Sequence, residues 1–203
     1  MSRSLVAVFA GFGVGAIVLT PNLSSPPAAE APSDLLPPGS RSAVHAEAPP
    51  AGHTGGFGEP TCRVCHDAYP LNEPGGRLTL EGLPERYRPG ETYALVVVLS
   101  VPETVRAGFQ LSARFEDGGQ AGSWQALDAR AAVADSSGIA YAHSTLSGTD
   151  PERGDHAVWG LSWTAPREGR PVQFHLAANS ANGDNSPFGD LVYATSTEVA
   201  SSP

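Results

Sequence analysis

The sequence predicts an all-β protein, an immunoglobulin-like β-sandwich, and three observations support this fold class. The 203 residues include 23 Gly and 19 Pro, about a fifth of the chain, which favours turns and short strands. From residue 76 onward, apolar residues alternate with polar ones, most clearly at Trp159, Leu161 and Trp163. No stretch shows the sustained 3.6-residue period of an amphipathic helix.

The N-terminal region has the composition of an export signal followed by a linker. Arg3 precedes an uncharged apolar run at residues 5–19, which is short for a membrane span and typical of a signal peptide. Residues 1–20 are therefore predicted to be a signal peptide or an uncleaved N-terminal anchor. Residues 21–52 are rich in Pro, Ala and Ser, and they predict a disordered linker. Either form of the signal predicts an extracytoplasmic protein, which is periplasmic, displayed on the cell surface or secreted.

The charge balance excludes one class of partner. The formal net charge is −9, and all 12 basic residues are Arg. A chain with this charge has no cationic surface to displace counterions from phosphates, so nucleic acid is not expected as a partner. Contact with a membrane is expected only through an uncleaved N-terminal segment.

The only two cysteines lie in one five-residue motif, Cys62-Arg63-Val64-Cys65-His66. This Cys-x-x-Cys-His pattern is the signature of covalent haem c attachment. Two thiols three positions apart on a tight turn can add to the two vinyl groups of one haem. The adjacent His66 then reaches the iron as proximal ligand. Residues 53–75 are therefore predicted to be a haem-binding segment, with Cys62, Cys65 and His66 as its cofactor-binding residues.

The motif has three other interpretations. A structural zinc site normally needs four ligands, and the sequence has no further cysteine. A thioredoxin-like redox pair needs a βαβ context, whereas the segments that follow are β-strands. A structural disulfide between Cys62 and Cys65 is compatible with an exported protein, although so small a loop constrains the unfolded chain little.

Residues 76–200 are predicted to form the sandwich. Eight short strands separated by turns are typical of an immunoglobulin-like fold. The strands are expected at residues 77–83, 92–101, 108–115, 123–127, 139–145, 157–164, 171–177 and 191–199. Parity places these residues on the inward faces: Phe109, Leu111, Trp159, Leu161, Trp163, Val172, Phe174 and Leu176. Residues 117–122 and 179–190 are expected to be loops. The second of these clusters Asn and Asp, but it lacks EF-hand spacing, so a hairpin loop is favoured over a calcium site.

Several ordered motifs in residues 52–203 resemble the bacterial choice-of-anchor V family, which is itself similar to the Reeler domain. They are GHTGGFGE (52–59), CRVCH (62–66), YRPGETY (87–93), GFQL (108–111), YAHS (141–144), WTAP (163–166), VQF (172–174), ANSANGD (178–184) and GDLVY (189–193). The resemblance implies an exported Reeler-type β-sandwich with a haem motif ahead of it, and no defined activity. The sequence departs from the family at His175, where an aromatic residue is usual.

A second iron ligand, if a side chain supplies one, is expected to be histidine, because Met1 belongs to the signal segment and Lys is absent. The candidates are His53, His143, His156 and His175, with His45 in the linker. His175 is expected to face outward, and His156 to be solvated in a charged loop. His143 lies on an ordered strand face and matches a histidine of the resembled family, so it is the predicted distal ligand. Relatives without a haem motif also carry histidine there, which leaves a structural role open.

The sequence therefore predicts an exported monohaem c-type cytochrome that transfers electrons to a redox partner protein or to other cytochromes. The alternative is a cell-surface Reeler-like interaction or adhesion domain, in which the haem or a Cys62–Cys65 disulfide is structural. A third interpretation is a haem enzyme or gas sensor with one open coordination site. No Ser-His-Asp order, paired-carboxylate motif or phosphate loop indicates a hydrolase or a phosphotransferase, so no enzyme class is assigned.

Overall fold

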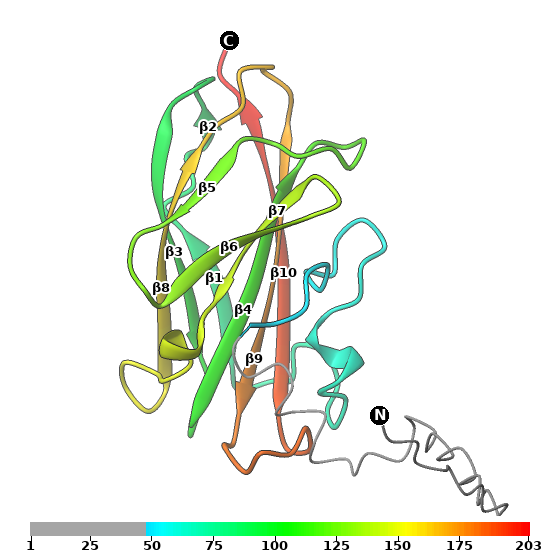
Figure 1. Cartoon of the computed structure of the whole chain (residues 1–203), viewed down its shortest axis with the longest axis vertical. Helices are drawn as coiled ribbons and strands as arrows, with labels where there is room; N and C mark the ends of the chain where they lie inside the picture. The colour runs from blue at the N-terminus through cyan, green and yellow to red at the C-terminus, as the bar shows by residue number, and fades with distance from the viewer. Residues whose placement is uncertain (1–47) are drawn as a thin grey trace, which may run out of the picture. The chain divides into compact units, whose positions relative to one another are not determined.

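Two β-sheets packed face to face form a sandwich, as Figure 1 shows. The structure, a computed structural model, describes residues 48–203, so the predicted signal segment and most of the predicted linker, including His45, lie outside the described residues. One sheet has the strand order β1-β3-β8-β5, and the other has the order β2-β10-β9-β4-β7-β6. Neighbouring strands are antiparallel except β2 and β10, which are parallel.

The strands of the four-stranded sheet are β1 (Arg77–Glu81), β3 (Thr92–Ser100), β5 (Ser123–Ala126) and β8 (His156–Thr164). Those of the six-stranded sheet are β2 (Arg86–Tyr87), β4 (Arg106–Arg114), β6 (Ala131–Ser136), β7 (Ile139–Ser144), β9 (Val172–Ala181) and β10 (Leu191–Ser201). Two short 3-10 turns, η2 (Cys62–Val64) and η3 (Leu146–Gly148), complete the elements. Within residues 48–203, no helix has the length and apolar character needed to cross a membrane.

The core lies between the sheets and confirms the predicted inward faces. Trp159, Leu161 and Trp163 of β8 are fully buried, as are the alternating apolar residues of β4 and β9. The Trp163 ring contacts four other aromatic rings, and its Nε1 donates a hydrogen bond to the Ala121 carbonyl oxygen at 3.1 Å. Burial of this aromatic cluster contributes to the stability of the sandwich together with the aliphatic residues of the core.

All eight predicted strands are present, and the structure adds two more, β2 and β6. β2 has only two residues, and β6 is an Ala-rich edge strand with little apolar alternation. Strand β9 also runs four residues further than predicted, to Ala181, because Asn179 pairs with both Val192 of β10 and Gly108 of β4. The predicted loop at residues 179–190 is therefore shorter, and Asn179 belongs to the sheet.

Residues 50–76 lie against the outer face and the β10 edge of the six-stranded sheet, as the cyan segment beside β4 and β10 in Figure 1 shows. Contact with the sheet begins before the predicted end of the linker at residue 52, because Gln110 Nε2 on β4 donates a hydrogen bond to the Pro50 carbonyl oxygen at 2.9 Å. Gln110 Oε1 accepts a hydrogen bond from the His53 amide at 2.7 Å. The six-stranded sheet is therefore the platform on which the Cys-x-x-Cys-His motif is held.

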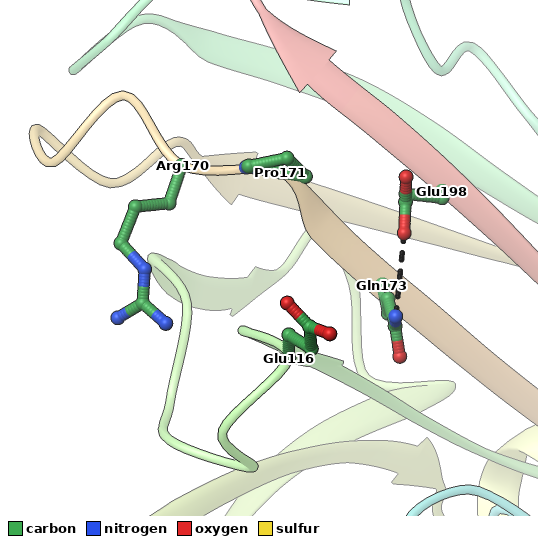
Figure 2. Close-up of a pocket in the computed structure, with 5 residues that line it drawn as sticks. All are labelled: Glu116, Arg170, Pro171, Gln173 and Glu198. Carbon is green, nitrogen blue, oxygen red and sulfur yellow. Dashed lines mark hydrogen bonds between the residues drawn. The ribbon is translucent and has the colours of Figure 1, made fainter.

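An open polar pocket of about 280 Å³ lies toward the other end of the same sheet (Figure 2). It is lined by Glu116, Arg170, Pro171, Gln173 and Glu198. Gln173 Nε2 donates a hydrogen bond to Glu198 Oε2 at 3.3 Å, while Arg170 forms an ion pair with Asp117. Six residues of β9, about 20 Å of strand, separate Gln173 from Asn179, so this pocket is distinct from the motif.

Candidate functional site

The Cys-x-x-Cys-His motif forms a single tight turn. The Cys62 carbonyl oxygen accepts hydrogen bonds from the Cys65 and His66 amides at 3.2 and 3.0 Å. The Thr61 hydroxyl oxygen caps the start of η2 by accepting a hydrogen bond from the Arg63 amide at 3.3 Å. Both thiols are free, with Cys65 exposed and Cys62 partly exposed. The turn therefore presents two thiols and the adjacent imidazole together.

The His66 ring is held by a carboxylate from a distant part of the chain. His66 Nδ1 lies 2.6 Å from Asp190 Oδ2, and Asp190 is only 1% exposed. A carboxylate can only accept a hydrogen bond, so Nδ1 carries the proton and donates it to Asp190. The other ring nitrogen, Nε2, is then the one with a free lone pair. This is the tautomer that a metal-binding histidine needs.

Asp190 is itself fixed by the connection between β9 and β10. Its Oδ1 accepts a hydrogen bond from the Asn182 amide at 3.2 Å. Asn179 Nδ2 lies 3.4 Å from His66 Nδ1 and 3.5 Å from Asp190 Oδ2, while its Oδ1 is buried without a partner. Gly189 has φ +88°, a left-handed conformation that favours glycine beside Asp190, and a Cβ there would lie 2.7 Å from the Asn182 side chain.

A buried polar cluster anchors the chain upstream of the motif. The Glu59 carboxylate accepts hydrogen bonds from Thr54 Oγ1 at 2.6 Å and Tyr141 Oη at 2.5 Å, and it forms an ion pair with Arg114. The Arg114 guanidinium also lies over the Phe57 ring, 5.1 Å from its centroid. These contacts attach residues 54–59 to strands β4 and β7.

The electrostatics of this cluster favour an ionised Glu59. Burial alone would raise the pKa of Glu59, but hydrogen bonds from Thr54 and Tyr141 and the positive charge of Arg114 outweigh it and hold the pKa below its usual value. Burial, reinforced by the neighbouring Glu59 carboxylate, raises the pKa of Tyr141 to about 12. The cluster therefore contains one carboxylate, one guanidinium and a neutral phenol.

Downstream of the motif, Asn72 attaches the chain to β10. The backbone N–H of Asn72 donates a hydrogen bond to the Val192 carbonyl oxygen at 2.9 Å, and its side-chain Oδ1 accepts one from the backbone N–H of Ala194 at 2.8 Å. Tyr193 Oη donates a hydrogen bond to the Glu73 carbonyl oxygen at 3.0 Å. The motif is thus held on both sides, by the Glu59 cluster before it and by Asn72 after it.

The structure places the predicted distal histidine, His143, on β7 and almost fully buried. It stands opposite Gln110, which in turn pairs with Ala177, so His143 is two strands away from β9 and its Asn179. His143 Nδ1 lies 2.9 Å from the Ser144 carbonyl oxygen, which leaves Nε2 as the nitrogen with a free lone pair. No hydrogen bond joins His143 to the motif within residues 48–203, and distal ligation by His143 stays a prediction.

The remaining histidines of the described chain each have their own environment. His53 is part of the ordered segment, with Nδ1 2.9 Å from the Pro50 carbonyl oxygen. His175 faces outward from the core as predicted, and a Cβ at Gly56 would lie only 2.3 Å from its ring. Burial lowers the pKa of His175. His156 is exposed and pairs with Asp155, as its charged surroundings predicted.

The chemistry of the motif fits a covalently bound haem. Its donor set is two free thiols and an imidazole whose Nε2 is available, which is the set that haem c requires. From the motif to residue 71 the chain exposes three large apolar side chains, Val64, Tyr69 and Leu71, which is the type of surface that an apolar macrocycle covers. Residues 48–203 contain no group of three or more His, Cys, Asp or Glu side chains that could hold a metal ion. Binding of a haem iron by His66 would not need such a cluster of side chains, because the porphyrin would supply most of the iron's ligands.

The thiol chemistry is less suited to dithiol–disulfide exchange. Burial raises the pKa of the Cys62 thiol to about 12, whereas reactive redox cysteines have a lowered pKa. The raised pKa of Cys62 is compatible with a structural disulfide, because a disulfide needs no thiolate at neutral pH once it has formed.

The loop that follows β9 is held by its own side chains. Asn182 Oδ1 accepts a hydrogen bond from the Asp184 amide at 3.0 Å, and Asp184 Oδ1 accepts one from the Ser186 amide at 2.8 Å. These are the local hydrogen bonds expected of Asn and Asp in a turn. Asn182 Oδ1 and Asp184 Oδ1, two of the oxygen atoms that suggested a calcium site, are thus used in hydrogen bonds within the loop.

Sequence reasoning missed Asp190 and Asn179 as functional residues. Both lie in segments of the family resemblance, ANSANGD and GDLVY, but neither segment indicates by itself a contact with His66. The contact joins positions 124 residues apart, and only the pairing of β9 with β10 beneath the motif brings them together. The one local signal was Gly189, because a glycine beside Asp190 indicates a backbone conformation that other residues rarely adopt.

No family model matches the chain, and no curated protein matches it. Similar solved structures include the Reelin-N domain of F-spondin, with 22% identity and a TM-score of 0.46, covering 70% of this chain and 98% of that chain. Two fragments of the human F-spondin reeler domain are similar at 21% and 24% identity, with TM-scores of 0.43 and 0.42. They cover 66% and 69% of this chain and 93% and 98% of their own. The choice-of-anchor V assignment stays a prediction.

Proposed function

We propose that this protein is an exported monohaem c-type cytochrome that carries electrons outside the cytoplasm. The observation that carries the proposal is the turn at Cys62, Cys65 and His66, where two free thiols stand beside an imidazole with an available Nε2. The apolar run at residues 5–19 supports export, and haem c is attached outside the cytoplasm.

The residues of the chain would divide the work between attachment and orientation. Cys62 and Cys65 would hold the haem through thioether bonds, and His66 Nε2 would bind the iron from one side. When bound, the haem supplies a one-electron iron couple. Asp190 fixes the His66 ring, while the Glu59 cluster and Asn72 hold the segment on the sheet. His143 is the proposed ligand on the second side, which would close the iron to substrates and favour electron transfer to a partner protein.

The test of this proposal is expression of the whole chain in a host with cytochrome c maturation. The purified protein should carry the mass of one haem, retained after denaturation because thioether bonds are covalent. Replacing both Cys62 and Cys65 by Ala should abolish attachment, while His156→Ala, a change at an exposed histidine, should leave it intact. Protein of unmodified mass from such a host would refute the proposal.

The second candidate is an interaction domain of Reeler type in which the two cysteines form a structural disulfide. The 3-10 turn supports it, because Cys62 and Cys65 lie one turn apart and both thiols are free to bond. The same mass measurement separates the two candidates. A chain that lacks haem and is lighter by two hydrogens before reduction supports the disulfide, and a chain with haem excludes it.

A further inference from the structure

We propose that Asp190 is a positioning residue that sets the donor strength of His66 and thereby holds the haem iron toward its oxidised state. The geometry points to this role because a nearly fully buried carboxylate accepts a 2.6 Å hydrogen bond from His66 Nδ1. The role of Asp190 rests on the proposed haem attachment. It concerns the regulation of that same site and not the identity of the cofactor.

The contact is built into the fold. His66 comes from the docked segment and Asp190 is the last residue of the β9–β10 connection, so neither can move far without breaking the hydrogen bonds that hold it. The Asp190 side chain is 2% exposed, while that of His66 is 27% exposed. The imidazole is therefore partly exposed, while its Nδ1 contacts a buried carboxylate.

A buried carboxylate acts on a metal through the imidazole between them. Donation of Nδ1–H to a carboxylate fixes the ring tautomer and makes Nε2 a stronger donor. The effect is larger where water is excluded, because electrostatic interactions are stronger at low dielectric. Ferric iron carries one more positive charge than ferrous iron, so a stronger donor and a nearby anion stabilise the ferric form. Outer-shell partners of this kind are a recognised means of tuning haem potential.

No cation compensates the carboxylate charge of Asp190 within residues 48–203. The one ionisable side chain in contact with it is His66, whose imidazole is neutral with its proton on Nδ1. The remaining partners of Asp190, the Asn182 amide and Asn179 Nδ2, are neutral donors. The carboxylate charge therefore acts on the imidazole and on whatever His66 binds.

The experiment compares the haem-loaded wild type with Asp190→Asn, which keeps the shape of the side chain and removes its charge. We expect haem still to attach. The equilibrium between oxidised and reduced protein should move toward the reduced form about tenfold or more, which is about 59 mV for a one-electron couple. Asp184→Asn is the matched control, because Asp184 is exposed and bonds only within the loop. An unchanged potential in Asp190→Asn, or an equal shift in Asp184→Asn, would overturn the role of Asp190.

A second measurement does not depend on haem or on the folding of a variant at Asp190. In the Cys62→Ala/Cys65→Ala chain, nitrogen-15 NMR at neutral pH should show His66 with its proton on Nδ1. Finding the proton on Nε2 would overturn the Asp190 contact. If the wild-type chain takes up no haem while the double variant shows Nδ1–H, the cytochrome proposal is refuted and the His66–Asp190 pair stands. The two failures are therefore distinguishable.

Discussion

Replacement of Glu59 by Gln tests whether the segment that carries the motif is docked as the structure shows. The change keeps the shape of the side chain and removes its charge. Arg114 would then be left with an 8% exposed guanidinium and no anionic partner. Breaking a buried ion pair in this way costs about 3–5 kcal/mol, because the remaining charge is neither solvated nor paired.

That cost is large for a domain of this size. The free energy of unfolding is about 5–15 kcal/mol for a typical domain, so the loss would be a substantial part of it. At about 2–4 °C per kcal/mol, the melting temperature should fall by roughly 6–20 °C. Adding Arg114→Met should recover most of the loss, because it removes the unpaired charge and keeps an apolar stem. Glu91→Gln is the matched control, because its pair with Arg88 is exposed and contributes at most about 1 kcal/mol.

The same variant makes a prediction about pH. The pKa of Glu59 is lower in the folded chain than in the unfolded chain, so its stabilisation is fully present above the unfolded pKa, near 4.5. That stabilisation is lost as the pH falls through the folded pKa. Urea unfolding followed by circular dichroism should therefore show a weaker acid dependence in Glu59→Gln than in the wild type. A cost below about 1 kcal/mol with unchanged acid dependence would refute the docked arrangement.

Four further predictions follow from the same structure. Trp163→Ala should lower the free energy of unfolding by about 3–5 kcal/mol, because the ring is fully buried among four aromatic neighbours, and a loss below about 1 kcal/mol in urea unfolding would contradict that packing. In haem-free protein at neutral pH, alkylation followed by mass spectrometry should modify exposed Cys65 before the partly exposed Cys62, whose thiol has a pKa raised to about 12, and equal rates would contradict this difference between the two thiols. His143→Ala should convert a low-spin haem spectrum to high spin while His156→Ala leaves it unchanged, and a low-spin spectrum in His143→Ala would remove His143 as ligand. A fragment of residues 76–200 should unfold cooperatively on its own, and a non-cooperative transition would mean that the docked segment completes the core.

The fold could be predicted from the sequence because its strongest signal is local. Alternation at Phe109, Trp159, Trp163 and Phe174 reports which side of a strand faces the core, and all four are buried as parity requires. Strands β2 and β6 escaped prediction because the first has two residues and the second carries mostly Ala. Neither has enough apolar contrast to reveal a strand.

The site was predictable only where its residues are adjacent in sequence. Cys62, Cys65 and His66 form one turn, so their spacing alone indicates shared chemistry. Asp190 and Arg114 reach the same segment from distant strands, and their roles depend on which strands pair with which. A carboxylate becomes a partner for His66 only after β9, β10 and residues 61–66 are packed together, and no periodicity in the sequence encodes that packing.

The docked segment lies outside the hydrophobic core of the sandwich. Among the described residues before Arg77, none belongs to the hydrophobic core between the sheets. The contacts that join the docked segment to the sandwich, in contrast, end on residues of the six-stranded sheet or its β9–β10 connection, among them Gln110, Arg114, Asn179, Asp190 and Val192. The motif itself therefore adds nothing to the apolar core, whereas the orientation of His66 depends on Asp190 and on the strand pairing that places it.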